Sequence, residues 1–142
     1  MSAVLVDANV LLDIFTEDAD WFAWSSGALE EAAQSSRLVI NAVIYAEASI
    51  RFSHIEEFEN ALPPSLAGRE PIPFESAFLA GKAFAAYRKR GGAKRRSLPG
   101  FFIGAHAAVA GYRLLTRDPR TYRTYFPSVE LIAPAAGRIK SR

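Results

Sequence analysis

Two short apolar runs, far apart in the sequence, each end at an aspartate. Val4–Val6 leads directly into Asp7, and Leu114–Leu115 is followed by Asp118 with two residues between. Runs of this length and composition are typical of strands that are buried on both faces of a parallel sheet. In open α/β sheets, ligands bind beyond the carboxyl ends of the strands. The two aspartates therefore predict a site at that edge, and their oxygen atoms favour a hard cation such as Mg²⁺ or Mn²⁺.

The length and composition of the chain suit one globular domain. It has 142 residues, of which 50% are apolar and 23% charged. We expect the domain to cover residues 1–134 and residues 135–142 to form a frayed tail. The absence of cysteine excludes disulfides and thiolate metal sites. Because no apolar run reaches the roughly 18 residues of a membrane helix and no basic leader begins the chain, we expect a cytoplasmic protein without a membrane partner.

Helices and strands are predicted to alternate along the chain. The expected strands are 4–6, 38–40, 71–73, 113–115 and 129–132, and the expected helices are 10–15, 20–34, 42–50, 54–62, 76–90 and 101–110. This alternation predicts a three-layer α/β/α domain with a central parallel sheet. Asp20 and Asn41 are expected to cap the helices that follow them. The two prolines of 71–73 place that weak strand at an edge of the sheet.

A third carboxylate, Glu47, lies between two alanines on a helix that is otherwise rich in apolar residues. Because unpaired buried carboxylates are rare, we favour a functional role for Glu47 over a surface position. The helix follows strand 38–40, so Glu47 can converge with Asp7 and Asp118. Two like charges 4 Å apart repel by about 4 kcal/mol at an effective dielectric near 20. A bound cation would relieve that repulsion.

Several polar or aromatic residues have both a functional and a structural interpretation. Asn9 and Thr116 can hydrogen-bond a ligating carboxylate or a metal-bound water, or they can stabilise turns. Asp13 is a weaker catalytic candidate that can instead cap or pair locally. For His106, on a helix of small residues, packing is favoured over catalysis. The aromatic residues within 21–24 fit either a partner surface or the core.

The segment 88–96 concentrates positive charge and contains no acidic residue. Its basic residues are Arg88, Lys89, Arg90, Lys94, Arg95 and Arg96. The formal net charge of the chain is +2, so without these six charges the remainder carries −4. Such a segment is either a solvated helix end and loop or a patch that contacts phosphate groups, as in RNA binding.

Several enzyme classes lack their usual motifs in this chain. It contains no P-loop, no dinucleotide-binding glycine fingerprint, no H-E-x-x-H and no G-x-S-x-G. A phosphotransfer receiver domain is also disfavoured. That class favours adjacent acids after the first strand, whereas Asp7 is followed by Ala8 and Asn9, and no lysine follows strand 129–132 before Lys140.

Four segments together resemble the PIN-domain nucleases, particularly the VapC-type toxins of bacterial toxin–antitoxin pairs. They are Val4–Asp13, Ile40–Glu47, Ser97–Ala107 and Leu114–Asp118, in the order of that family. The resemblance covers about residues 3–133. It implies a compact α/β/α domain with the activity of a Mg²⁺- or Mn²⁺-dependent endoribonuclease, which leaves 5′-phosphate and 3′-hydroxyl ends. It also implies a homodimer and a small VapB-type antitoxin as partner.

The resemblance assigns Asp7, Glu47 and Asp118 to the acids of the family, and Thr116 to its accessory hydroxyl. The chain departs from the pattern at Leu98–Gly100, because the family normally reads Leu-Pro-Asp there. A missing carboxylate predicts weak or absent cleavage, since changes to supporting residues alone typically cost about 10- to 100-fold. Either a toxin has been disabled so that a host can make it, or the protein has drifted into a non-cleaving module that binds RNA or an antitoxin. The otherwise intact motif favours the first.

Overall fold

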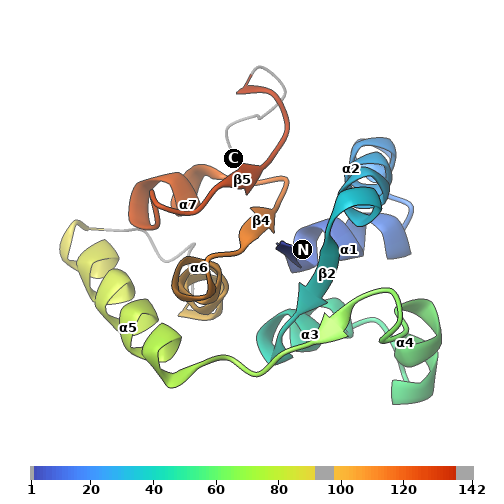
Figure 1. Cartoon of the computed structure of the whole chain (residues 1–142), viewed down its shortest axis with the longest axis horizontal. Helices are drawn as coiled ribbons and strands as arrows, with labels where there is room; N and C mark the ends of the chain where they lie inside the picture. The colour runs from blue at the N-terminus through green and yellow to red at the C-terminus, as the bar shows by residue number, and fades with distance from the viewer. Residues whose placement is uncertain (1, 92–97, 137–142) are drawn as a thin grey trace.

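A five-stranded parallel sheet forms the centre of the computed structural model, which describes residues 2–91 and 98–136 (Figure 1). The strands are β1 (Ala3–Val6), β2 (Arg37–Ile40), β3 (Gly68–Arg69), β4 (Arg113–Leu115) and β5 (Leu131–Ile132). The helices are α1 (Ala8–Phe15), α2 (Phe22–Ser35), α3 (Ala42–Ala48), α4 (Ile55–Ala61), α5 (Phe74–Lys89), α6 (Leu98–Ala110) and α7 (Arg120–Tyr125). The strand order is β3-β2-β1-β4-β5, and every pairing is parallel.

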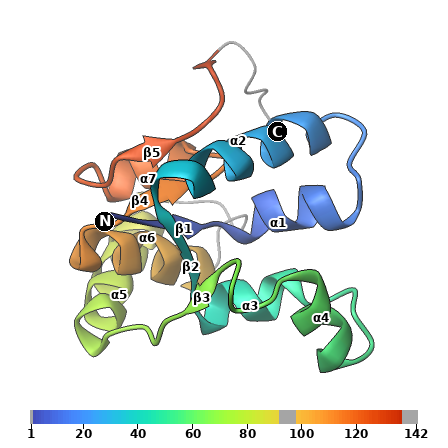
Figure 2. The same ribbon diagram turned by 45° about the vertical axis from the view of Figure 1, so that its right-hand side comes forward.

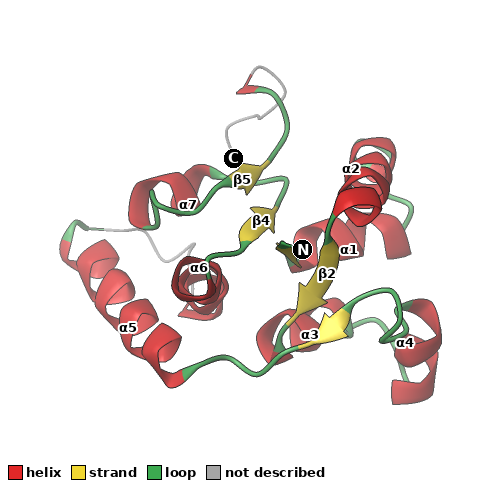
Figure 3. Cartoon of the chain, in the orientation of Figure 1, coloured by secondary structure: helices red, strands yellow, loops and turns green. Residues whose placement is uncertain are grey.

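The helices cover both faces of the sheet, which confirms the predicted three-layer α/β/α domain. Helix α2 lies on one face, and α5 and α6 pack against each other on the opposite face (Figures 1 and 2). The alternation of helix and strand along the chain is visible in Figure 3. Among the described residues, no helix is both long and apolar enough to cross a bilayer.

Strand β1 lies at the centre of the sheet, between β2 and β4. All of its residues are buried, and Val4, Leu5 and Val6 have no exposed surface. A central strand with helices on both faces requires apolar side chains on both of its sides. This requirement explains the continuous apolar run that precedes Asp7.

The register of the sheet brings the ends of β1 and β4 together. Val6 lies beside Leu115 in the parallel pairing of β1 with β4. One residue further, the backbone N–H of Asp7 donates to the carbonyl oxygen of Leu115 at 2.9 Å. Asp7 and Thr116 therefore leave the sheet at the same edge, as the sequence predicts for parallel strands.

The edge strand differs from the prediction. β3 covers Gly68–Arg69, not residues 71–73, and the N–H of Glu70 makes the next hydrogen bond, to the carbonyl oxygen of Ile40 at 2.9 Å. The prediction was wrong because Pro71 and Pro73 have no N–H to donate to a neighbouring strand.

The start of α2 and the presence of α7 also differ from the prediction. Helix α2 starts after Trp21 and not at Asp20, since Oδ1 of Asp18 accepts hydrogen bonds from the N–H groups of Asp20 and Trp21, both at 2.9 Å. The sequence analysis did not predict α7. That helix has six residues and the sequence Arg-Thr-Tyr-Arg-Thr-Tyr, which has no aliphatic stripe to mark it as helical.

The buried His106 links α6 to the start of α3. The Oδ1 atom of Asn41 accepts from the N–H of Ile44 at 2.9 Å, as the predicted cap, so its Nδ2 atom faces Nδ1 of His106 at 3.0 Å. Because Nδ2 can only donate, Nδ1 must be the unprotonated acceptor. Burial lowers the pKa of His106, although Glu70, whose Oε1 lies 3.9 Å from Nε2, opposes the shift. His106 is therefore a packed residue, as favoured from the sequence.

We expect His106 to make folding stability fall when the pH drops below its unfolded pKa, near 6.5. Its lowered pKa means that the unfolded chain binds the proton more readily than the folded protein. The effect is at most about 1.4 kcal/mol per pH unit and vanishes above that pKa. Urea unfolding at about pH 7.5 and about pH 5.5 measures it. A His106→Gln variant should lose this component, and an unchanged difference between the two pH values would contradict the assignment.

Candidate functional site

A cavity of about 350 Å³ lies at the edge of the sheet where β1 and β4 end. It is lined by Asp7, Ala8, Asn9, Leu12, Glu47, Ile50, Gly100, Phe101, Ile103, Asp118, Thr121 and Tyr122. The three predicted carboxylates and Gly100 therefore share one cavity, although they come from four separate parts of the chain. Asp13 and Thr116 do not line it.

Several donors hold one carboxylate oxygen of Asp7. Its Oδ2 atom accepts from the hydroxyl of Thr116 at 2.8 Å and from the hydroxyl of Tyr122 at 2.9 Å, with Nδ2 of Asn9 at 3.5 Å. Only 6% of the Asp7 surface is exposed. Burial raises the pKa of Asp7, and the hydrogen bonds from Thr116 and Tyr122 oppose that shift.

Asn9 and Thr116 join the two strand ends into one hydrogen-bonded unit. Nδ2 of Asn9 donates to Oγ1 of Thr116 at 3.2 Å, and Oδ1 of Asn9 accepts from the N–H of Arg117 at 3.3 Å. The same Oγ1 atom accepts from the N–H of Asp118 at 3.1 Å. Both residues therefore contact Asp7, while Asn9 also holds the backbone of Arg117 and Thr116 that of Asp118.

Glu47 reaches the cavity from α3, where it is half-buried. Burial raises the pKa of Glu47, and the negative charge of Asp7 raises it further. Two carboxylates that raise one another's proton affinity would each be stabilised by a cation between them. The charge interaction supports the predicted proximity of Glu47 and Asp7.

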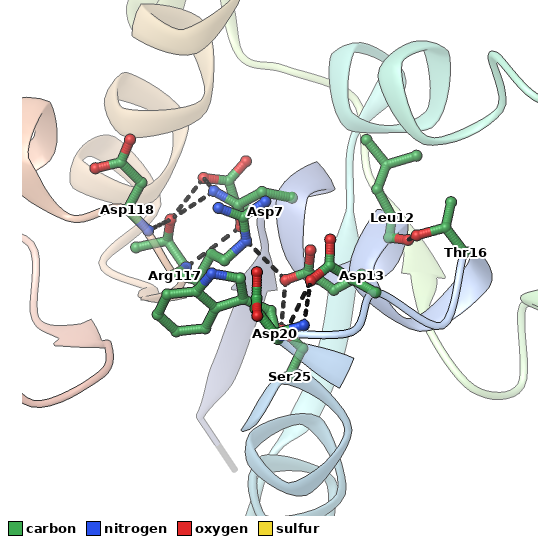
Figure 4. A network of polar contacts seen from close by, with 12 residues as sticks. Asp7, Leu12, Asp13, Thr16, Asp20, Ser25, Arg117 and Asp118 are labelled. Carbon is green, nitrogen blue, oxygen red and sulfur yellow. Dashed lines mark hydrogen bonds and ion pairs between the residues drawn. The ribbon is translucent and has the colours of Figure 1, made fainter. Parts of the chain in front are cut away.

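Asp118 is oriented differently from Asp7. In Figure 4 the Asp7 carboxylate lies within the hydrogen-bond network, whereas the Asp118 carboxylate extends away from it. Arg120, at the start of α7, donates from Nε to Oδ1 of Asp118 at 3.0 Å and from Nη2 to Oδ2 at 3.4 Å. The guanidinium thus provides a positive charge for Asp118.

The donor chemistry of the cavity fits a hard divalent cation, because its charged groups are carboxylates and it has no sulfur ligand. The geometry is open. Within residues 2–91 and 98–136, no three histidine or acidic side chains are grouped closely enough to hold an ion. A cation that bound all three acids would require their carboxylate groups to move closer together.

Gly100 lines the cavity at the position where the sequence resemblance predicts an acid. It lies in the first turn of α6, which begins at Leu98 and so earlier than predicted. Among the residues that the structure describes, a Cβ atom built on Gly100 would meet no heavy atom within 4 Å outside its chain neighbours and the backbone of its own helix, and the backbone φ is not positive. Neither a turn nor close packing requires glycine here, so a larger side chain can be accommodated.

Tyr122 is a site residue that sequence reasoning missed, since it lies on the unpredicted helix α7. Burial, followed by the negative charge of Asp7, raises the pKa of Tyr122 well above its usual value. The phenol therefore stays protonated and donates to Asp7. No apolar stripe marks α7 in the sequence, so no pattern signalled Tyr122.

Asp13 has a structural partner and lies outside the cavity. Its Oδ2 atom accepts from Oγ of Ser25 at 2.7 Å and from Nε of Arg117 at 2.8 Å. The guanidinium of Arg117 in turn lies 5.4 Å from the ring centroid of the buried Trp21. This interaction ties α1 and α2 to the residue that precedes Asp118, so Trp21 belongs to the core.

The basic segment is only partly described by the structure. Arg88 and Lys89 end α5, Arg90 follows them, and all three side chains are exposed. The guanidinium of Arg90 lies 5.6 Å from the ring centroid of Tyr125 on α7. Lys94, Arg95 and Arg96 lie outside the described residues.

We expect Arg117→Met to destabilise the protein by about 3 kcal/mol, because it leaves the buried carboxylate of Asp13 without its counter-charge. Urea unfolding measures the effect. Arg123→Met on the exposed side of α7 is the matched control and should change stability little. Equal effects of the two substitutions would show that the Asp13–Arg117 pair does not stabilise the fold.

Solved structures of other proteins share the fold of this chain. The solved structures similar to this chain include VapBC2 from Rickettsia felis bound to a promoter DNA fragment, with 15% identity, a TM-score of 0.71 and coverage of 94% of this chain and 99% of that chain. VapBC-1 from nontypeable Haemophilus influenzae has 15% identity and a TM-score of 0.70, with coverage of 92% and 97%. A toxin–antitoxin complex from Klebsiella pneumoniae has 22% identity and a TM-score of 0.59, with coverage of 89% and 94%. At these identities they support the fold alone.

No curated protein sequence matches the chain. The family description "PIN domain", however, matches residues 4–127, from the first residue of the apolar run before Asp7 to beyond α7. That range includes the three acids, Gly100 and Tyr122. The chain therefore belongs to the PIN domain family.

Proposed function

We propose that this PIN domain is a metal-dependent endoribonuclease of the VapC type, the toxin of a toxin–antitoxin pair, and that Gly100 impairs it. One observation carries the proposal: Asp7, Glu47 and Asp118 line a single cavity at the carboxyl edge of the sheet, and Gly100 lines it too. Membership of a nuclease family supports the reaction class. The metal, the RNA substrate and the roles of the individual residues are parts of the proposal.

Asp7, Glu47 and Asp118 would hold Mg²⁺ or Mn²⁺. When bound, such an ion lowers the pKa of a coordinated water and offsets charge on a phosphoryl group. The chain itself supplies a fixed carboxylate at Asp7, through the hydroxyl of Thr116, and a second acid of raised pKa at Glu47. The cleaved bond is the phosphodiester, attacked in line by water.

Arg120 would compete with a cation for the carboxylate of Asp118. Its guanidinium contacts both oxygens of Asp118, so a cation that recruits Asp118 must compete with that ion pair. The pair is partly exposed, with 41% and 26% of the two side chains accessible, and pairs of this kind contribute little to stability. Asp118 can therefore change partner at small energetic cost.

We propose that the substrate is RNA and that the basic segment 88–96 binds its phosphate groups. The exposed Arg88, Lys89 and Arg90 provide positive charge at the end of α5, next in sequence to the helix that carries Gly100. Hydrolysis by water makes no use of the ribose 2′-hydroxyl as nucleophile. Preference for RNA would therefore depend on contacts to that hydroxyl and on single-strand access.

A VapB-type antitoxin is proposed as the partner, since the solved relatives are VapBC assemblies and a toxin–antitoxin complex. A second copy of this chain is proposed as well. Phe74 and Phe78, one turn apart on α5, are 91% and 69% exposed, and an apolar pair so exposed supports a protein interface.

A second function is a non-cleaving PIN module that binds RNA or an antitoxin. Two observations favour it: the cavity carries Gly100 where the family has an acid, and Asp118 is held by Arg120. Binding of RNA would then depend on the basic segment alone, without a metal ion.

We expect Gly100→Asp to raise RNA cleavage in the presence of Mn²⁺ by at least about 10- to 100-fold and to arrest growth of the host. A Cβ atom at this position meets none of the described residues outside its own helix within 4 Å, which leaves room for the start of the new side chain. Cleavage of labelled single-stranded RNA measures the gain. Gly100→Asn is the matched control, because it has nearly the same shape but no charge, and it should show little gain.

The addition of Asp7→Asn to the Gly100→Asp variant should abolish the gained cleavage, since it removes a proposed metal ligand. If Gly100→Asp neither cuts RNA nor arrests growth, the impaired-nuclease proposal is wrong and the non-cleaving module is favoured.

Replacement of Arg95 and Arg96 by Gln is expected to weaken RNA binding and to flatten its salt dependence. With fewer contacts to phosphate groups, fewer counterions are released from the RNA when the protein binds. Fluorescence anisotropy at low and high salt measures both quantities. Affinity that is unchanged at both salt concentrations would mean that the segment is a solvated loop.

A further inference from the structure

We propose that Tyr122 is a positioning residue of the cavity: together with Thr116 it holds Oδ2 of Asp7, so that Asp7 presents its other oxygen to a divalent cation. The inference concerns the cation of the proposed function and rests on it. It assigns a role to α7, a helix that the sequence motifs do not include.

The contacts of Asp7 define the clamp. The hydroxyl of Tyr122 lies 2.9 Å from Oδ2, the hydroxyl of Thr116 lies 2.8 Å from it, and Nδ2 of Asn9 lies 3.5 Å from it. A carboxylate oxygen has about two lone pairs, so two close donors fill its capacity. Oδ1 accepts none of these three side-chain hydrogen bonds, and the proposal assigns the cation to it.

The clamp joins three parts of the chain. Asp7 follows β1, Thr116 follows β4, and Tyr122 lies on α7, which is also the helix that begins with Arg120. The sheet fixes the first two residues by their register. Tyr122 contacts Asp7 from a third element, helix α7. Its ring is buried, since only 7% of its surface is exposed.

Gly104 on α6 allows the ring of Tyr122 to reach Asp7. A Cβ atom at Gly104 would lie 3.0 Å from Cδ1 of Tyr122 and 2.6 Å from Cε2 of Phe126. Any larger residue would push one or both rings away from α6. The absence of a side chain at this position thus brings α7 against α6 and places the phenol at the cavity.

Tyr122→Phe tests the clamp, because it removes only the hydroxyl and retains the ring that packs against α6. Tyr125→Phe is the matched control: it removes the same group from the same helix, from a ring that packs against Tyr87 and Phe101. Both substitutions are made in the full chain and in the Gly100→Asp background. Mn²⁺ affinity is measured from the electron paramagnetic resonance signal of the free ion, and thermal melting verifies that each variant folds.

Tyr122→Phe should weaken Mn²⁺ binding by about 10-fold or more, as loss of a group that orients a metal ligand usually does, while Tyr125→Phe leaves it unchanged. Thr116→Val should weaken it as well. The double variant should depart from the product of the two single effects, because both hydroxyls hold the same oxygen.

The outcomes separate this inference from the proposed function. If the parent proteins bind Mn²⁺ and Tyr122→Phe binds it as tightly as Tyr125→Phe does, the positioning role is wrong and the metal site stands. If neither the unsubstituted chain nor its Gly100→Asp variant binds Mn²⁺, the proposed metal site is wrong, and the inference fails with it. A crystal structure of Tyr122→Phe in which the Asp7 carboxylate is unmoved in the presence of Mn²⁺ would also overturn the clamp.

Discussion

The pairing of β1 with β4 is the interaction on which the site depends. It sets Val6 beside Leu115, and the next hydrogen bond runs from the N–H of Asp7 to Leu115. Asp7 and Thr116 then meet at 2.8 Å although 109 positions separate them in the chain. A shift by one residue would turn the side chains of β1 to opposite faces and remove Asp7 from the cavity. The buried apolar strands therefore fix the geometry of the polar site.

Much of the fold and part of the site could be predicted from the sequence. Continuous apolar runs identify β1 and β4, and the rule that ligands bind at the carboxyl edge of parallel strands places Asp7 and Asp118 there. The sequence could not predict α7, since its Arg, Thr and Tyr residues form no apolar stripe, and so Tyr122 was missed. It also could not show that Arg120 contacts Asp118, because that ion pair depends on side-chain orientation at the start of α7.

The cavity combines a rigid part and an adaptable part. Asp7 is buried and held by hydroxyl groups, whereas Asp118 is partly exposed and paired with Arg120. Gly100 contributes open space instead of a charge. The negative charge of Asp7 raises the pKa of Glu47, so the two carboxylates repel one another in the cavity. A bound cation would offset this repulsion. This account explains why the family's fold is intact while its reaction is proposed to be weak.

We propose that Asp7, Glu47 and Asp118 form one binding site for a divalent cation. Anomalous diffraction from crystals of the Gly100→Asp variant soaked in Mn²⁺ tests it most directly. The account predicts a manganese peak in the cavity, bounded by carboxylate oxygens of Asp7, Glu47 and Asp118, with Asp118 turned away from Arg120. A well-ordered structure at saturating Mn²⁺ with no peak in this cavity, and with Asp118 still paired to Arg120, would contradict it.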